Sequence, residues 1–184
     1  MLTSAWRPRP MPSMRTLVLL RHAKSSWADP DLEDFDRPLN QRGRLAAPLM
    51  GAWLVERGLR PDIVFSSSSA RTRETWERAR VAFPDPPPVE ETDRLYHAAP
   101  DAMLAILRGA PAEAACVLMI GHQPGIGAFA RRLSAPEQPA HCARAFQKFP
   151  TAAAAVLTFD VADWGEVDYG AGRFTQFAVP GELV

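Results

Sequence analysis

Three short apolar runs constrain the fold of this chain most, because each is followed at once by polar residues and then by a helical pattern. The apolar runs are Thr16–Leu20, Asp62–Phe65 and Cys116–Ile120. The helical patterns that follow them cover Asn40–Glu56, Ala70–Phe83 and Gly125–Leu133. Apolar runs of this length are typical of strands buried on both faces. Their alternation with helices predicts a mostly parallel sheet that helices cover on both sides.

Further segments extend this alternation toward the C-terminus. We expect a short strand, a helix and two closing strands, over Val89–Leu95, Pro100–Leu107, Thr151–Phe159 and Gly172–Val179. For the alanine run Ala152–Ala155 a helix is the alternative to a tightly packed strand. The segment Asp160–Phe174 is expected to be an edge loop. The predicted fold class is therefore α/β, a three-layer sandwich with a mostly parallel sheet flanked by helices.

The spacing of apolar residues predicts which helix faces turn inward. In the first helix, which Asn40 is placed to cap, Leu45, Leu49 and Trp53 recur every four residues. This recurrence predicts that these three side chains face the core. In the two later helices the predicted inward positions are Thr72, Trp76, Ala79 and Phe83, and Ile126, Phe129, Ala130 and Leu133.

Length and charge limit what the chain can be. A single domain over residues 14–184 is the default for 184 residues with 47% apolar content. Residues 1–13 contain prolines and arginines without periodicity, which predicts a disordered leader, with a Pro-rich docking peptide as the alternative. Twenty-one basic residues balance 21 acidic ones. This balance argues against a protein that mainly binds nucleic acid or acidic membranes.

The cysteine count and the lengths of the apolar runs indicate which cellular compartment to expect. Cys116 and Cys142 are too few for a disulfide framework and lack the spacing of a zinc site. No run of about 18 apolar residues is present to span a membrane. We therefore expect a reducing, cytoplasmic location.

Basic side chains follow the three predicted strands. Arg21 and His22 follow the first strand, Arg71 follows the second after the serine run 66–69, and His122 follows the third. The carboxyl ends of parallel strands meet at one edge of a sheet, where α/β proteins bind ligands. We expect no matching cluster of carboxylates at this edge. A basic pocket in a chain without net charge points to a small, concentrated anion, and phosphate is the obvious candidate.

These residue types suit phosphoryl chemistry. An arginine presents a planar fork of donors that matches two phosphate oxygens, and Arg71 also lies in the first turn of its predicted helix. A neutral imidazole can attack phosphorus, and His22 is the predicted nucleophile because it leaves a buried strand beside an arginine. His122 can donate a hydrogen bond to the equatorial oxygens. Since the arginines supply the positive charge, we predict no metal and no other cofactor.

Each of these residues also has a plainer explanation. Arg71 could be a solvated helix charge, His122 a turn residue between glycines, and Ser66–Ser69 only a loop and helix cap. The occurrence of three such motifs at three predicted strand ends favours the catalytic interpretation. Both catalytic histidines must hold particular protonation states, so activity should fall below about pH 6.

The motifs resemble those of the histidine phosphatase superfamily, which has the phosphoglycerate-mutase-like fold. The segments LVLLRHAKSSW, SSSSARTRET, MIGHQPGI and DFDRPLNQRG resemble its Arg-His, catalytic-arginine, second-histidine and first-helix motifs. RHAKSSW, the short length and FPTAAAAVLTFD resemble its small SixA-type phosphohistidine phosphatases. The resemblance runs from about Met14 to Val184. It implies a phosphate pocket of Arg21, His22, Arg71 and His122, in which His22 is phosphorylated and then hydrolysed by water.

The resemblance also implies contacts around this pocket. Lys24, Ser25 and Asn40 lie in matching motifs and are candidates to touch phosphate or substrate. A helix N-cap is the alternative for Asn40, and a rim charge the alternative for Lys24. The loop Trp27–Arg37 is expected to shape access, unless its acidic residues are only solvated charge; these are Asp29, Asp31, Glu33, Asp34 and Asp36.

One departure from the family's pattern concerns the proton donor. Larger relatives place a glutamate or aspartate after the third strand, where this chain has His97 as a candidate substrate-binding residue. An alkoxide leaving group needs strong protonation, whereas an imidazole, with a pKa near 6.5, needs much less. The missing carboxylate therefore favours phosphohistidine as substrate. The alternatives are that His97 is itself the acid, that Asp101 or Glu91 reaches the site, or that His97 is inert.

The predicted function is a metal-independent phosphatase with a phosphohistidine enzyme intermediate, most simply one that removes phosphate from phosphohistidine on a protein. Its partner would be that phosphorylated protein, with no nucleic acid and no membrane involved. A phosphatase for a small phosphate ester is the first alternative. A module that binds phosphate without turnover is the second, and the intact set of four pocket residues argues against it.

Overall fold

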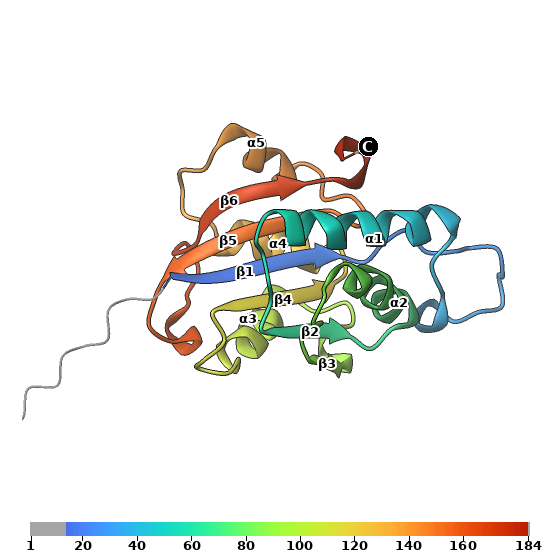
Figure 1. The fold of residues 1–184 in the computed structure, drawn as a ribbon, viewed down its shortest axis with the longest axis horizontal. Coiled ribbons are helices and arrows are strands. Elements are labelled where there is room, and N and C mark those ends of the chain that lie inside the picture. The colour runs from blue at the N-terminus through green and yellow to red at the C-terminus, as the bar shows by residue number, and fades with distance from the viewer. Residues whose placement is uncertain (1–13, 184) are drawn as a thin grey trace, which may run out of the picture.

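A six-stranded sheet forms the centre of the molecule (Figure 1). The computed structural model describes residues 14–183, so the predicted leader over residues 1–13 lies outside the described residues. The strands stand in the order β3-β2-β4-β1-β5-β6, with bounds β1 Met14–Arg21, β2 Ile63–Ser67, β3 Val89–Thr92, β4 Cys116–Gly121, β5 Ala154–Asp160 and β6 Arg173–Ala178. Strands β1 to β4 are parallel, whereas β5 and β6 are antiparallel to their neighbours. The predicted mostly parallel sheet is confirmed.

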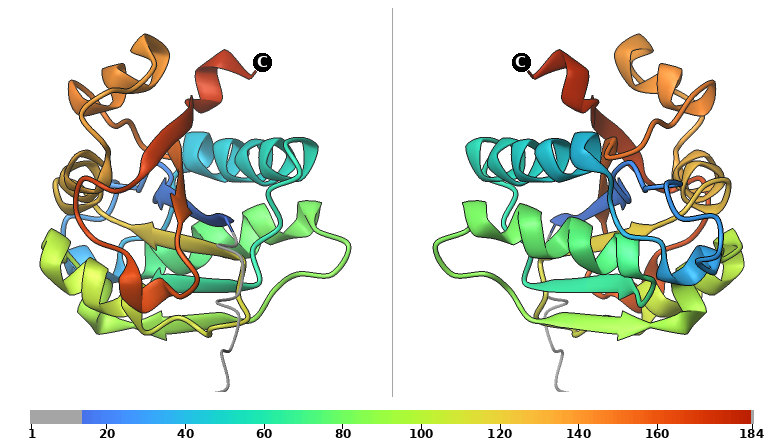
Figure 2. Two further views of the ribbon diagram at one scale, coloured as in Figure 1. Left: turned by 90° about the vertical axis from the view of Figure 1, so that its left-hand side faces the viewer. Right: turned by 90° about the vertical axis from the view of Figure 1, so that its right-hand side faces the viewer.

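Helices cover both faces of this sheet, as Figure 2 shows edge-on. One face carries α1 (Gln41–Glu56) and α2 (Ala70–Ala79), and the other carries α3 (Pro100–Arg108) and α4 (Gly125–Leu133). A short helix, α5 (Ala140–Ala143), packs beside β6. Side chains of β1 alternate between the two cores, with Leu17 and Leu19 in one and Val18 and Leu20 in the other. The three-layer α/β fold is therefore as predicted. None of the helices within residues 14–183 is long and apolar enough to cross a membrane.

The predicted inward face of α1 is wrong. Leu45 is 65% exposed and Leu49 is 37% exposed, and of the three predicted positions Trp53 alone is buried. Half of the buried positions are instead glycine or alanine; the six are Gly43, Ala47, Met50, Gly51, Trp53 and Leu54. A β-carbon on Gly51 would lie 2.1 Å from the carbonyl oxygen of Ala79 in α2. Close approach of the two backbones therefore selects small residues here. The predicted inward faces of α2 and α4 are buried as expected.

Two C-terminal predictions also need correction. Strand β5 begins at Ala154, because Ala152 has a φ of 59° in the turn before it, so the alanine run is only half strand. The segment Asp160–Phe174 is more than an edge loop. Trp164 is fully buried, and its indole N–H donates to the carbonyl of Ala114 at 2.7 Å. An indole buried with its N–H paired anchors this segment to the core.

Candidate active site

The carboxyl ends of β1, β2 and β4 meet at one edge of the sheet, which we call the catalytic edge. Arg21, the last residue of β1, pairs with Gly121 of β4. His22 and His122 follow these two residues directly, and their ring centroids lie 5.0 Å apart. Arg71 lies in the first turn of α2, and its guanidinium contacts His122. The structure therefore brings the four predicted pocket residues together.

The backbone fixes the orientation of His22. Its Nδ1 lies 2.8 Å from the carbonyl oxygen of Ala23, which can only accept, so the Nδ1–H donates. The Ala23 N–H in turn donates to the hydroxyl of Thr75 in α2 at 3.0 Å. Burial lowers the pKa of His22 to about 3, and the nearby Arg71 adds to this effect. The imidazole is therefore neutral at pH 7, with its lone pair on Nε2.

His122 uses both ring nitrogens within the site. Nη2 of Arg71 lies 3.2 Å from its Nδ1, and a guanidinium can only donate, so Nδ1 accepts. Its Nε2–H then donates to the hydroxyl of Ser67 at 2.9 Å. Burial lowers the pKa of His122 to about 2, and the neighbouring His22 and Arg71 contribute less. The plainer alternative for Ser66–Ser69, only a loop and helix cap, is wrong in its first half, since β2 continues through Ser67 and the Ser67 hydroxyl contacts His122.

A carboxylate that sequence reasoning missed lies in this pocket. Oδ2 of Asp34 accepts from Arg71 Nη2 at 2.8 Å, from the Tyr96 hydroxyl at 2.7 Å and from His97 Nε2 at 3.2 Å. The Asp34 carbonyl accepts from Nη1 of Arg71 as well. Burial alone would raise the pKa of Asp34, but its three donors outweigh burial and hold that pKa well below its ordinary value. This single carboxylate comes from the loop Trp27–Arg37 and not from a strand end, so the expectation of no carboxylate cluster at the strand ends stands. The alternative that Asp34 is only solvated charge is wrong.

His97 packs against His122, as His22 does. Its ring centroid is 5.0 Å from that of His122, and its backbone adopts a left-handed φ of 48°. Tyr96 packs edge-on against both rings. The structure therefore puts His97 at the pocket, as its place in the motif implied. Asp101 and Glu91 are engaged elsewhere, with the first bound by Tyr169 and Arg132 and the second by Arg73.

Lys24, Ser25 and Asn40 lie at the two ends of the loop that joins β1 to α1, where these ends contact each other. The Asn40 N–H donates to the carbonyl of Lys24 at 2.9 Å, and Ser25 forms a β-bridge with Leu39. The side chain of Asn40 accepts from the Gly43 N–H at 2.9 Å. This is the geometry of a helix N-cap, which is the alternative that the sequence left open. Lys24 is exposed at the rim.

The positive charge of the pocket comes from two close guanidinium groups. Arg21 donates from Nη1 to the carbonyl of Phe149 at 2.8 Å. Burial and the neighbouring charge of Arg71 lower the pKa of Arg21. Two cations held this close favour a bound anion. In the part of the chain that the structure describes, no group of three or more histidine, cysteine or acidic side chains could hold a metal ion.

Comparison with known proteins places this geometry in a family. The model of the histidine phosphatase superfamily (branch 1) matches residues 17–99. An uncharacterized protein of Mycobacterium tuberculosis is 32% identical over 163 residues, which cover 88% of this chain and 99% of that protein. A solved structure from Nakamurella multipartitia, described as a candidate phosphohistidine phosphatase SixA, is 30% identical. It superposes with a TM-score of 0.80 over 91% of this chain and 96% of its own. The chain belongs to the histidine phosphatase superfamily.

Within the superfamily, this histidine phosphatase is of the SixA type. The protein histidine phosphatase SixA, solved with tungstate, is 25% identical and superposes with a TM-score of 0.75, over 92% of this chain and 99% of that one. A phosphoglycerate mutase of Plasmodium falciparum shares the fold alone. The histidine phosphatase is therefore a hydrolase that acts as a phosphatase, on the phosphoglycerate-mutase-like fold.

Proposed function

We propose that this histidine phosphatase removes the phosphoryl group from phosphohistidine on a protein, through a covalent intermediate on His22 and without a metal ion. The orientation of His22 carries this proposal. Because its Nδ1–H donates to the carbonyl of Ala23, the Nε2 lone pair is the one that can attack phosphorus. Arg21, Arg71 and His122 lie beside this ring, where the oxygens of a phosphoryl group would need donors.

The reaction has two half-reactions. In the first, Nε2 of His22 attacks phosphorus, and the bond from phosphorus to the substrate imidazole breaks. That imidazole leaves with the electron pair and takes up a proton. In the second, water attacks phosphorus and loses a proton, the bond to Nε2 breaks, and phosphate leaves. Arg21 and Arg71 offset the oxygen charges throughout. The Nε2–H of His122, which donates to Ser67 in the free protein, is the group of that ring that would donate to an equatorial oxygen.

The leaving group is the reason to favour phosphohistidine. Asp34, the carboxylate found in the pocket, is held ionised by its three donors and has no proton to give. A leaving imidazole has a pKa near 6.5 and needs little help, whereas an alkoxide needs a strong acid. The pocket therefore suits the P–N bond of phosphohistidine better than the P–O bond of an ester.

One observation favours a second candidate function, a phosphatase for small phosphate esters. His97 Nε2 donates to the Asp34 carboxylate at 3.2 Å, so an imidazole N–H lies at the pocket, with its ring beside that of His122. A positioned imidazole N–H is a group that can pass a proton to a leaving alkoxide. The two candidate functions differ in substrate and in whether His97 must donate a proton to the leaving group. Both use His22 as the nucleophile.

The proposal includes a phosphorylated protein as partner and the cytoplasm as location. Cys116 and Cys142 are both buried free thiols, which suit a reducing compartment. The partner would present its phosphorylated imidazole at the catalytic edge.

The test is phosphate release from a phosphohistidine peptide and from free phosphohistidine, beside a panel of phosphate monoesters, with EDTA present. We expect fast release from the phosphohistidine substrates and slow release from the esters. His22→Ala should abolish turnover, because it removes the nucleophile. Arg71→Ala should lower the rate by about 100-fold or more, because it removes a preorganised charge donor.

Other outcomes would overturn distinct parts of the proposal. A preference for a monoester would reject phosphohistidine as substrate and favour His97 as a working acid. Loss of activity in EDTA would reject the metal-free mechanism. Residual turnover by His22→Ala would reject His22 as the nucleophile, and no turnover of any substrate would leave a phosphate-binding module.

A further inference from the structure

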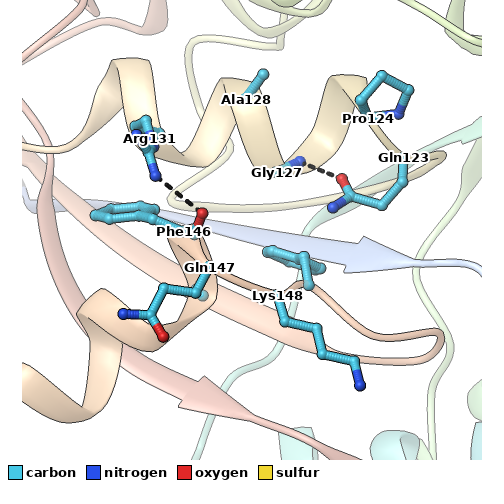
Figure 3. Close-up of a pocket in the computed structure, with 10 residues that line it drawn as sticks. Gln123, Pro124, Gly127, Ala128, Arg131, Phe146, Gln147 and Lys148 are labelled. Atoms are coloured by element: carbon cyan, nitrogen blue, oxygen red, sulfur yellow. Dashed lines mark hydrogen bonds between the residues drawn. The ribbon is translucent and has the colours of Figure 1, made fainter.

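Two grooves flank the catalytic edge. The first, of about 270 Å³, lies along α1 and is lined by Lys24, Arg42, Leu45, Leu49, Pro150 and Val179 among others; we call it the α1 groove. The second, of about 240 Å³, lies between α4 and the turn 144–149 and is lined in part by Gln123, Arg131, Phe146 and Lys148. We call it the α4 groove, and Figure 3 shows it.

Both grooves are joined to the catalytic residues by the chain itself. Lys24 of the α1 groove comes two residues after His22, and Gln123 of the α4 groove comes directly after His122. Residues 148–149 line the α4 groove and residues 150–151 line the α1 groove. Between them, the carbonyl of Phe149 accepts from Arg21. A molecule that fills either groove therefore extends from the place where the phosphoryl group would react.

The grooves share one sign of charge. The α1 groove has Lys24 and Arg42, and the α4 groove has Arg131 and Lys148. None of the described residues that line the two grooves is an aspartate or glutamate, although the chain has as many acidic residues as basic ones. This segregation of charge is complementary to an acidic partner.

The α1 groove also has an exposed apolar part. Leu45 is 65% exposed and Leu49 is 37% exposed, one helical turn apart on the outer side of α1. In the α4 groove, Arg131 donates to the carbonyl of Phe146 at 2.9 Å and its guanidinium lies over the Phe146 ring, as Figure 3 shows for the hydrogen bond. Side chains that combine apolar area with positive charge are typical of protein-binding surfaces.

We propose that the two grooves together form a docking surface for an acidic segment of the protein that bears the phosphohistidine. Carboxylates of that segment pair with Arg42 and Lys148 on the two sides of the phosphorylated imidazole, and an apolar side chain covers Leu45. This inference rests on the proposed function. It explains how the enzyme would prefer a phosphorylated protein to a free metabolite.

The experiment compares two synthetic phosphohistidine peptides and free phosphohistidine. One peptide has glutamates and a leucine around the phosphohistidine, and the other has glutamines in place of the glutamates. For the unaltered chain we expect a KM at least about tenfold lower for the acidic peptide, with similar kcat. The double variant Arg42→Gln/Lys148→Gln should remove this preference and leave the rate on free phosphohistidine unchanged. Leu45→Ser should raise the KM of both peptides.

A matched control separates this surface from general charge. Arg60 is an exposed arginine just beyond α1, at the end of the helix away from the catalytic edge, and Arg60→Gln should keep the preference. Equal KM values for the two peptides, or a preference that survives in the double variant, would overturn the docking surface while free phosphohistidine is still hydrolysed. Failure to hydrolyse any of the three phosphohistidine substrates would instead overturn the proposed function, and the docking surface with it.

Discussion

At the scale of single residues, the pairing of Asp34 with Arg71 sets the electrostatics of the pocket. The side chain of Arg71 is only 4% exposed, and both of its terminal nitrogens contact Asp34. The carboxylate thus partly neutralises the guanidinium that a phosphoryl group would need. It also repels a dianion that approaches the same arginine. Asp34 therefore limits the affinity for oxyanions while it positions Arg71, Tyr96 and His97.

Replacing Asp34 by asparagine should separate these two effects. In Asp34→Asn we expect inorganic phosphate to inhibit about fivefold to tenfold more tightly, because an anion beside Arg71 is gone. The kcat on free phosphohistidine should fall, because Arg71 and His97 lose the charge that holds them. Steady-state inhibition by phosphate measures the first effect and turnover measures the second.

The neighbouring acid provides the control for this prediction. Asp36 lies in the same 3-10 turn, Asp34–Asp36, and is exposed. Asp36→Asn removes the same charge from the same loop, and we expect near-normal inhibition and turnover. Unchanged phosphate inhibition in Asp34→Asn would show that this carboxylate does not compete for the phosphate site.

Sequence reasoning reached Arg21, His22, Arg71 and His122 but not Asp34, and the reason is physical. The four residues follow strands or begin a helix, so the topology of the sheet alone brings them together. Asp34 is one of five acidic residues in the stretch 29–36. Which of them enters the pocket depends on how the loop returns, through the bridge of Ser25 to Leu39. A local pattern does not contain that information.

At the scale of elements, two glycines rather than Leu45 and Leu49 mark the inner face of α1. A β-carbon on Gly43 would lie 2.2 Å from the carbonyl oxygen of Lys24, and one on Gly51 would lie 2.1 Å from that of Ala79. Hydrophobic periodicity predicted the wrong face, with Leu45 and Leu49, because it gives no weight to glycine. Where two backbones touch, the smallest residues mark the inner face.

These two glycines allow a matched prediction. Alanine at either position should lower the free energy of unfolding by about 1–3 kcal/mol, because a backbone must move to admit the methyl group. The better helix propensity of alanine, worth about 1 kcal/mol, offsets only part of this cost. Gly43→Ala should also lower kcat, since Lys24 lies two residues from His22. Gly51→Ala should leave kcat nearly unchanged, since it affects the contact of α1 with α2.

Urea unfolding and turnover on free phosphohistidine measure both consequences in the same samples. Equal losses of kcat in the two variants would contradict the idea that Gly43 controls the position of the turn after His22. A stable Gly51→Ala variant would show instead that α1 and α2 can separate slightly without cost.

At the scale of the whole molecule, the alternation of strands and helices was enough to predict the layers and the edge that holds the site. The direction of β5 and β6 was not predicted. No crossover helix joins them in the described chain, and strands joined without one pair antiparallel. The burial of Trp164 was also missed, because a single tryptophan in a polar segment carries no periodic signal. Strands β5 and β6 stand at the other edge of the sheet from β2 and β3. Trp164 contacts Ala114 just before β4, at the opposite end of that strand from His122. The predicted site was therefore unaffected.

Burial of the two histidines at the catalytic edge couples the site to the stability of the whole fold. In the unfolded chain a histidine takes up a proton as the pH falls through about 6.5. In the folded chain His22 stays neutral down to a pKa of about 3 and His122 down to about 2. The unfolded state therefore binds more protons below pH 6.5, and the folded state loses stability as the pH falls from there toward 3. The lowered pKa values of both rings also mean that their protonation in the free protein sets in at a lower pH than the value of about 6 expected from the sequence.

We therefore expect the free energy of unfolding to fall by at least about 2 kcal/mol between pH 7 and pH 4.5 through these two histidines, a shift of one pKa unit being worth about 1.4 kcal/mol. Urea unfolding at both pH values measures the total fall, to which carboxylates also contribute. His22→Asn removes one of the two buried imidazoles and leaves the carboxylates in place, so its fall should be clearly smaller than that of the unaltered chain. An equal fall in the two proteins would mean that His22 titrates in the folded state as an exposed histidine does. The Nδ1 bond to Ala23 would then not protect a neutral ring, and the nucleophile would need another way to shed its proton at acidic pH.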